Sequence, residues 1–227
     1  VVEYKETKYW KQRRDVLVKQ LGREPKSLLD VGCETGDFLM LFPKVQSRQG
    51  VELSKFSVDI AAKRGLIVHN EFLENIEFKQ KFEVVTAFAI LEHLAEPHKF
   101  LNKLETLVED NGILLILIPT HECFKAKFMN FIRRRWKMNS PPEHLNFYSR
   151  LFLDQHLSGK GYTLEKRYFD SGGNFNPLSR IPFVGRLTAL LVSLADKWIF
   201  ASVPFFDHMY SIYRKKQTKG VENSINT

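Results

Sequence analysis

The stretch of sequence that decides the fold is Leu28-Leu29-Asp30-Val31-Gly32-Cys33-Glu34-Thr35-Gly36-Asp37-Phe38-Leu39. An apolar run leads into a turn with two glycines, and a helical apolar pattern follows the turn. Glycine permits positive φ and a close approach of the backbone to a ligand. The amide groups that open a helix can bind a carboxylate or a phosphate. The stretch therefore predicts a strand, a cofactor-binding turn and a helix.

A carboxylate stands twenty residues beyond Gly32, because Glu52 lies near the end of the second expected strand, at 48–53. A carboxylate at this point of an α/β fold can accept hydrogen bonds from both hydroxyls of a ribose. Either feature alone has a plain structural explanation, but together they favour a nucleoside cofactor. The turn lacks the third glycine of G-x-G-x-x-G, which argues against a nicotinamide-dependent oxidoreductase.

Apolar runs alternate with helical patterns along most of the chain, which predicts an α/β fold. Several runs are apolar on both faces, as expected for a central parallel sheet. Ser54 is a predicted N-cap, and Pro97 opens a helix whose apolar stripe extends to Val108 and which Asn111-Gly112 would end. A further helix is expected from Ser149 to Leu157. The expected strands are 27–31, 48–53, 66–69, 82–88, 113–118, 162–168 and 208–213.

Composition indicates one globular domain. The 227 residues carry 34 basic and 26 acidic side chains, a net charge of +8, which favours anionic partners of some kind. Cys33 and Cys123 form no disulfide framework, as in a reducing compartment, and the first twenty residues hold no apolar stretch typical of a signal peptide. We therefore expect a cytoplasmic protein.

Four segments resemble, in chain order, motifs of the class I S-adenosylmethionine-dependent methyltransferases. Asp30, Gly32, Glu34 and Gly36 resemble the family's D-x-G-x-G-x-G motif. Segments 82–94 and 112–119 look like its fourth and fifth strands. Segment 142–149 (Pro-Glu-His-Leu-Asn-Phe-Tyr-Ser) resembles the E-H-x-x-F/Y-S element of the small-molecule and sugar-type branch, the type 11/23 kind. The resemblance implies a Rossmann-like, doubly wound sheet of seven strands, mostly parallel with an antiparallel last strand, and helical insertions.

The expected organisation is one methyltransferase domain over 1–227. An N-terminal helical segment (1–24) precedes a cofactor-binding core (25–120) and a basic, aromatic substrate lid (121–148). The remainder (149–227) holds the last strands and an inserted amphipathic helix at 183–202.

The resemblance implies S-adenosylmethionine as the cofactor and a set of residues around it. The first motif would surround the methionine end, Glu52 would bind the ribose, and Leu53 and Leu73 would contact the adenine, with Phe88 bordering the site. Both leucines and Phe88 are equally compatible with an ordinary core. The expected cofactor-binding residues are Asp30, Gly32, Cys33, Gly36, Glu52, Leu53, Leu73 and Phe88.

One departure from the motif is Glu34, which stands where the middle glycine is usual. A non-glycine residue in left-handed geometry costs about 1 to 2 kcal/mol, so we expect Glu34 to point outward with φ below zero. An inward carboxylate would repel the cofactor's own carboxylate, and the alternative is then a catalytically weak or inactive S-adenosylmethionine-binding protein.

Two histidines are candidates for the chemistry. Methyl transfer to a hydroxyl needs a proton acceptor, and imidazole has a reference pKa of about 6.5. His144 is the preferred base and His93 a wall of the site, with Glu92 and Glu143 as neighbours that would orient them. The seven histidines show no H-x₃-H or H-E-x-x-H spacing, so no metal is expected.

Two amphipathic segments complete the sequence. Phenylalanines at helical spacing over 124–132 are surrounded by lysines and arginines, and an apolar stripe follows at 187–201. A substrate lid and a capping helix are the favoured interpretation, and peripheral contact with an anionic membrane is the alternative. The predicted function is methyl transfer to a small-molecule or lipid-linked acceptor, at oxygen. An RNA-directed methyltransferase is disfavoured, because the segment after the fourth apolar run lacks a D/N-P-P-Y-type tetrapeptide.

Overall fold

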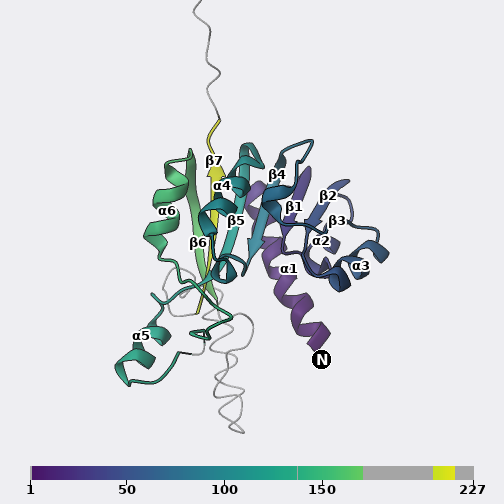
Figure 1. Cartoon of the computed structure of the whole chain (residues 1–227). Helices are drawn as coiled ribbons and strands as arrows, with labels where there is room; N and C mark the ends of the chain where they lie inside the picture. The colour runs from purple at the N-terminus through teal and green to yellow at the C-terminus, as the bar shows by residue number, and fades with distance from the viewer. Residues whose placement is uncertain (1, 137, 171–206, 218–227) are drawn as a thin grey trace, which may run out of the picture.

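The computed structural model describes residues 2–136, 138–170 and 207–217. Seven strands of the described residues form one sheet in the order β3-β2-β1-β4-β5-β7-β6 (Figure 1). β1 to β5 are parallel, and β7 runs antiparallel between β5 and β6. This confirms the predicted fold class. The strands are β1 (Ser27–Val31), β2 (Ser47–Val51), β3 (Ile67–His69), β4 (Phe82–Phe88), β5 (Val108–Pro119), β6 (Tyr162–Asp170) and β7 (His208–Lys215).

Capping residues fix where several helices begin. The Ser54 side chain accepts a hydrogen bond from the Ser57 N–H, and the Ser149 side chain accepts one from the Phe152 N–H, as N-cap residues do. The helices are α1 (Val2–Leu21), α2 (Asp37–Met40), α3 (Lys55–Lys63), α4 (Pro97–Thr106), α5 (Phe124–Phe131) and α6 (Arg150–Ser158), with short 3₁₀ turns η1 (Leu73–Asn75) and η2 (Leu91–His93).

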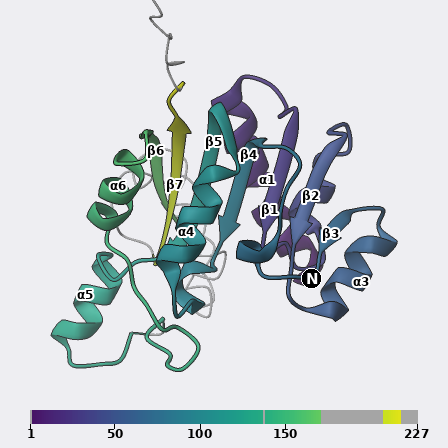
Figure 2. The same cartoon turned by 45° about the horizontal axis from the view of Figure 1, so that its top comes forward.

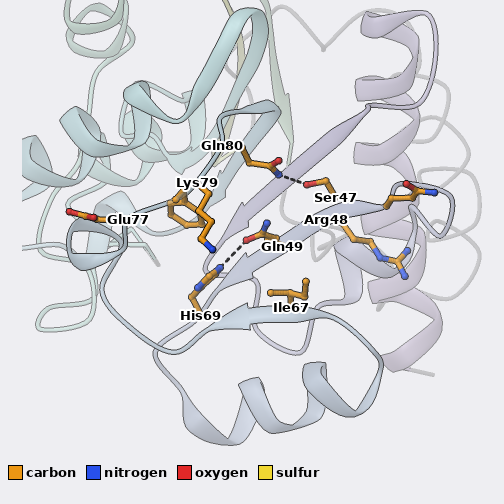
Figure 3. A pocket seen from close by; sticks show the side chains of 10 residues that line it. Ser47, Arg48, Gln49, Ile67, His69, Glu77, Lys79 and Gln80 are labelled. Carbon is orange, nitrogen blue, oxygen red and sulfur yellow. Dashed lines mark hydrogen bonds between the residues drawn. The ribbon is translucent and has the colours of Figure 1, made fainter.

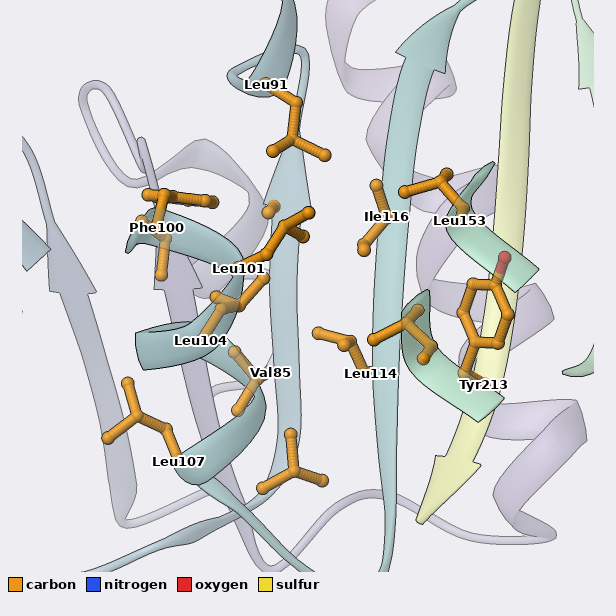
Figure 4. Packing of buried hydrophobic residues seen from close by; sticks show 14 of the residues in the cluster. Val85, Leu91, Phe100, Leu101, Leu104, Leu107, Leu114, Ile116, Leu153 and Tyr213 are labelled. Carbon is orange, nitrogen blue, oxygen red and sulfur yellow. The ribbon is translucent and has the colours of Figure 1, made fainter. Parts of the chain in front are cut away.

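Helices cover both faces of the sheet because alternate strand residues point to opposite sides. Leu114 and Ile116 of β5 pack with residues of α4 and α6, as Figure 4 shows for Leu101, Leu104 and Leu153. The intervening β5 residues, Ile113, Leu115 and Leu117, belong to a second apolar cluster that includes residues of α1, α2 and α3. Figure 2 shows α4 and α6 on one side of the sheet and α1 on the other. Because both faces are covered, every residue of the central strands β1 and β4 is buried.

The end of α4 corrects one expectation. The helix ends at Thr106, and Val108 belongs to β5, where it pairs with Phe82 of β4. The register then shifts, so that Val84 pairs with Ile113 and Asn111-Gly112 lies inside an irregularity of β5 and does not end the helix. A Cβ on Gly112 would lie 2.8 Å from two backbone oxygens, so the glycine serves this close approach. Val108 follows Leu104 by four residues, which fits the helical period, and for this reason the sequence pattern places it in the helix.

Two further points concern helical segments. The inserted amphipathic helix at 183–202 lies outside the described residues. Among the residues that are described, no helix combines the length and the apolarity needed to cross a bilayer.

Candidate active site

The turn after β1 lies against the end of β2. The backbone N–H groups of Gly32 and Cys33 both donate to the Val51 carbonyl, at 2.8 and 3.1 Å. Gly32 and Gly36 have φ of 71° and 82°, a region that favours glycine. The backbone conformation favours the glycine, and a Cβ on Gly32 would also lie 2.7 Å from Cδ1 of Ile90 and displace the end of that side chain. The predicted strand, turn and helix are present, although α2 is only one helical turn.

Glu34 corrects the expectation about its backbone. Its φ is +48°, not below zero, although its side chain is exposed as expected. The left-handed conformation directs the Glu34 N–H at Glu52, where it donates to Oε2 at 3.0 Å. Glu34 therefore adopts the left-handed backbone that a glycine would favour, and its side chain stays exposed.

Glu52 lies directly after β2, and the backbone holds both of its carboxylate oxygens. Oε2 accepts from Glu34, and Oε1 accepts from the Ser54 N–H at 2.7 Å. The Asn70 side chain donates to the Glu52 carbonyl at 2.9 Å, which ties the end of β3 to the same corner. A half-buried carboxylate fixed beside a glycine turn fits a ribose, because each oxygen retains a lone pair for a hydroxyl.

Asp30 is buried within β1, 2% exposed, directly opposite Thr86 of β4. The Thr86 hydroxyl donates to Asp30 Oδ1 at 2.6 Å. The pKa of Asp30 is raised to about 7, chiefly by burial and also by the nearby charges of Glu34 and Glu52, against the opposing effect of the Thr86 hydrogen bond. Thr86 is a residue that the sequence analysis missed, and its signal is a hydroxyl in the mostly apolar run 82–88.

The remaining expected cofactor residues differ in exposure. Leu53 is 54% exposed at the carboxyl edge of the sheet. Leu73 is 3% exposed and belongs to the cluster under α4, and Phe88 packs its ring on Trp10 and Phe38 in the opposite cluster. Cys33 is buried and packs against Gly50, where an added Cβ would lie 2.4 Å from its sulfur, and burial raises the pKa of its thiol. Leu53 alone among these four presents an open apolar surface.

The two candidate histidines lie together, with ring centroids 5.0 Å apart in an edge-on arrangement. The segment before α6 brings them together by pairing with η2. Leu145 and Asn146 donate their N–H groups to the Glu92 carbonyl at 2.7 and 3.1 Å, and the Tyr148 hydroxyl donates to the Leu91 carbonyl at 3.1 Å. Burial, chiefly, and the charge of Glu92 raise the pKa of Tyr148 to about 12, so it stays a donor.

Each imidazole has one nitrogen against a backbone carbonyl. His93 Nδ1 lies 2.6 Å from the Glu143 carbonyl, and His144 Nδ1 lies 2.7 Å from the Met138 carbonyl. A carbonyl oxygen only accepts, so both Nδ1 atoms carry the hydrogen and both Nε2 atoms have a lone pair in the neutral ring. Glu143 therefore orients His93 as expected, but through its backbone oxygen.

Glu92, expected to be a neighbour that orients the histidines, is 1% exposed and therefore not a solvated surface charge. Its Oε2 atom is buried without a hydrogen-bond partner. Burial raises the pKa of Glu92 to about 7, an effect that its own backbone N–H and the charge of His93 oppose. A ligand atom from each of Glu92, His93 and His144 lies within 4.8 Å of the others.

A surface hollow of about 530 Å³ lies elsewhere (Figure 3). It is lined by residues 46–49 at the start of β2, by Ile67 and His69 of β3 and by residues 77–80 before β4, with His69 hydrogen-bonded to Gln49 at 2.9 Å. Residues 46–49 and 77–80 lie at the amino ends of β2 and β4, whereas Gly32 and Glu52 follow the carboxyl ends of β1 and β2. The hollow is therefore separate from the site described above.

The sheet order, the glycine turn and the carboxylate after β2 together define a class I methyltransferase, a class whose methyl donor is S-adenosylmethionine. The family profile described as "Methyltransferase domain" matches residues 3–167, well over half of the chain. The chain belongs to this family.

Individual proteins resemble it more distantly. A ubiquinone biosynthesis O-methyltransferase of Rhodopseudomonas palustris (strain HaA2) is 24% identical over 189 residues, with 73% of this chain and 72% of the relative covered. One of the same name from Coxiella burnetii is 23% identical over 175 residues, covering 73% and 74%. A crystal structure of magnesium protoporphyrin IX methyltransferase from Synechocystis, with bound S-adenosylhomocysteine, matches with a TM-score of 0.62 at 11% identity, covering 94% and 84%; this likeness concerns the fold.

Proposed function

We propose that this methyltransferase transfers the methyl group of S-adenosylmethionine to a hydroxyl oxygen of a small-molecule or lipid-linked acceptor. The observation that carries the proposal is the His93–His144 pair, in which both rings keep an unprotonated Nε2 at the carboxyl edge of the sheet. The relatives named O-methyltransferases of ubiquinone biosynthesis support an oxygen acceptor.

The cofactor, when bound, supplies a methyl group on a sulfonium, which is already a good leaving group. The chain's own contribution is alignment and exclusion of water. Glu52 would hold the ribose hydroxyls and Leu53 would cover the adenine. Gly32, Gly36 and the Asp30 carboxyl would surround the methionine end, with Cys33, Leu73 and Phe88 packed behind the site.

The proton of the acceptor needs a destination as the new O–C bond forms and the C–S bond breaks. His144 is the proposed base, because the Met138 carbonyl fixes its Nδ1–H and leaves Nε2 to take up the proton. His93 is the wall beside it. A positioned base of this kind contributes typically 10²- to 10⁴-fold to the rate.

A lipid-linked acceptor is supported by α5. Its face carries Phe124, Phe128 and Phe131, which are 57%, 47% and 83% exposed. The segment 124–135 contains five lysines and arginines and no acidic residue. The opposite face is held by Trp136, whose indole N–H donates to Asp207 at 3.1 Å. Exposed aromatic rings beside cationic side chains suit the surface of an anionic membrane.

The test is methyl transfer from labelled S-adenosylmethionine to hydroxylated aromatic compounds with and without an isoprenoid tail. Mass spectrometry should detect a product heavier by one methyl group on oxygen. His144→Ala should reduce turnover by about a hundredfold or more and leave S-adenosylhomocysteine affinity unchanged, and His98→Ala, on α4, is the matched control.

Unchanged turnover in His144→Ala would remove this residue from the mechanism. Methylation at nitrogen, or of RNA in preference to every small acceptor, would overturn the proposed acceptor. Cofactor binding with no methylated product from any of these acceptors would favour a binding protein without turnover.

A further inference from the structure

We propose that Glu92, His93 and His144 form a binding site for a divalent transition-metal cation of the zinc type. One possible ligand atom from each of the three residues lies within 4.8 Å of the others, so the side chains must move closer together to share one ion. Ligands of a tetrahedral zinc ion, bound at about 2.0 to 2.1 Å, stand roughly 3.3 Å apart. His93 is exposed and His144 half-buried, so their side chains have room to close this gap.

The first argument is the tautomer that the backbone imposes on both rings. Metal-ligating histidines commonly donate their second ring N–H to a carbonyl or carboxylate, which fixes the ring and directs the lone pair at the ion. Here His93 donates to the Glu143 carbonyl and His144 donates to the Met138 carbonyl. Among the described residues, neither Nε2 has a hydrogen-bond partner, so both are available as ligands.

The second argument is Glu92. A buried carboxylate oxygen without a hydrogen-bond partner destabilises the folded protein, because its hydrogen bonds to water are lost and none replaces them. Glu92 is 1% exposed, and its Oε2 is buried without a hydrogen-bond partner. The carbonyl of the same residue accepts two backbone N–H groups from the His144 segment, so the carboxylate stays beside the two rings. A cation between them would supply the missing partner.

The ligand set indicates the type of cation. Two imidazoles with one carboxylate form a three-residue set that leaves a coordination position open, as in catalytic zinc sites. Imidazole suits zinc, cobalt, nickel or iron, whereas magnesium prefers an all-oxygen shell. His93 is exposed, which gives a cation from solvent a path to the cluster.

The catalytic consequence rests on the proposed function, but cation binding does not. With the cation in place, His144 Nε2 would be a ligand and no longer the base: the cation would bind the acceptor oxygen and lower the pKa of its hydroxyl, so that the proton is released to solvent before the methyl group is transferred. No local spacing in the sequence points to such a site, because its ligands come from two segments, one that precedes β5 in the chain and one that follows it.

The experiment is a calorimetric titration of the chelator-treated, full-length protein with Zn²⁺, repeated with Co²⁺ and Mg²⁺, without cofactor or acceptor. We expect one equivalent of Zn²⁺ at micromolar affinity or tighter, visible absorption bands for bound Co²⁺, and little heat with Mg²⁺. His93→Gln and His144→Gln should each weaken Zn²⁺ binding by roughly tenfold or more. Glu92→Gln should weaken Zn²⁺ binding to a similar extent, provided that circular dichroism shows the variant to be folded. If it does not fold, the variant of the exposed His93 still tests the site.

His98→Gln is the control, because this exposed histidine contacts Phe152 and His156 outside the cluster. It should bind Zn²⁺ as the wild type does. Absence of saturable Zn²⁺ binding, or wild-type affinity in both His93→Gln and His144→Gln, would overturn the proposal. Cluster-dependent Zn²⁺ binding in a protein that methylates no hydroxyl would leave the metal site standing and sink the proposed function.

Discussion

At the scale of single residues, the site depends on carboxylates whose surroundings differ. Glu52 is held by two backbone amides near solvent, whereas Asp30 is enclosed in the sheet with one hydroxyl partner. The first is suited to bind a ligand as an anion, and the second changes its charge near neutral pH. The two residues therefore give two separate predictions.

Glu52→Gln should weaken S-adenosylhomocysteine binding by about ten- to a hundredfold, because a hydrogen bond to a charged acceptor contributes roughly 1.5 to 3 kcal/mol. The variant should stay folded, since its amide oxygen can still accept from Ser54. Calorimetry measures the affinity, and Glu96→Gln, which alters an exposed carboxylate paired with Lys99, is the control. Equal affinities for Glu52→Gln and wild type would contradict the ribose role.

Asp30→Asn should change how stability depends on pH. Burial raises the Asp30 pKa to about 7, against about 3.9 in the unfolded chain. Between these values the folded protein holds a proton that the unfolded chain has released, so stability falls as pH rises, by roughly 1.4 kcal/mol per pH unit. The asparagine variant has no such proton.

Urea denaturation at about pH 4.5 and about pH 7.5 measures this difference. The free energy of unfolding of Asp30→Asn, relative to wild type, should rise by a few kcal/mol between the two conditions. Parallel pH profiles for the two proteins would show that Asp30 has an ordinary pKa.

At the scale of elements, α5 is a helix with one anchored face. Cys123, Ala126 and Trp136 pack together on the buried side, and the aromatic residues opposite them remain exposed. The favoured interpretation from sequence was a lid, and the exposed phenylalanines support the alternative of membrane contact. The two roles predict different behaviour toward lipid.

We expect the protein to co-sediment with anionic vesicles in low salt and to be released by high salt, because each lysine or arginine near such a surface contributes about 1 kcal/mol. Replacing Phe128 and Phe131 together by serine should reduce binding. Leu151→Ser, which alters an equally exposed apolar residue of α6, should not. Sedimentation of wild type independent of lipid charge, or no loss in the double variant, would dismiss the membrane role.

At the scale of the whole molecule, the proposed cofactor site draws on the ends of β1, β2 and β4, so a ligand bound there should stabilise the entire fold. A ligand at a hundred times its dissociation constant adds about 2.7 kcal/mol to stability. For a domain of this size that raises the Tm by about 5 to 10 °C. S-adenosylhomocysteine should produce this shift and NAD should not, as differential scanning calorimetry can measure; a comparable shift with NAD would refute the assignment.

The sequence by itself determined the α/β sheet and the glycine turn after β1. The glycines at 32 and 36 and the strands that are apolar on both faces each act over a few residues, so local pattern suffices to predict them. The sequence also placed the cap at Ser54 and the start of the helix near Ser149, because an N-cap hydrogen bond joins residues three apart.

Only the tertiary structure decided how distant residues combine. The left-handed backbone of Glu34 follows from its bond to Glu52, the buried state of Glu92 from the segment that covers η2, and the end of α4 from the pairing of Val108 with Phe82. In each case the partner lies far along the chain. The side-chain types in the sequence limit the roles that each residue can have. The burial of a residue and its distance to other residues, which decide its protonation state and its contacts, exist only after the chain has folded.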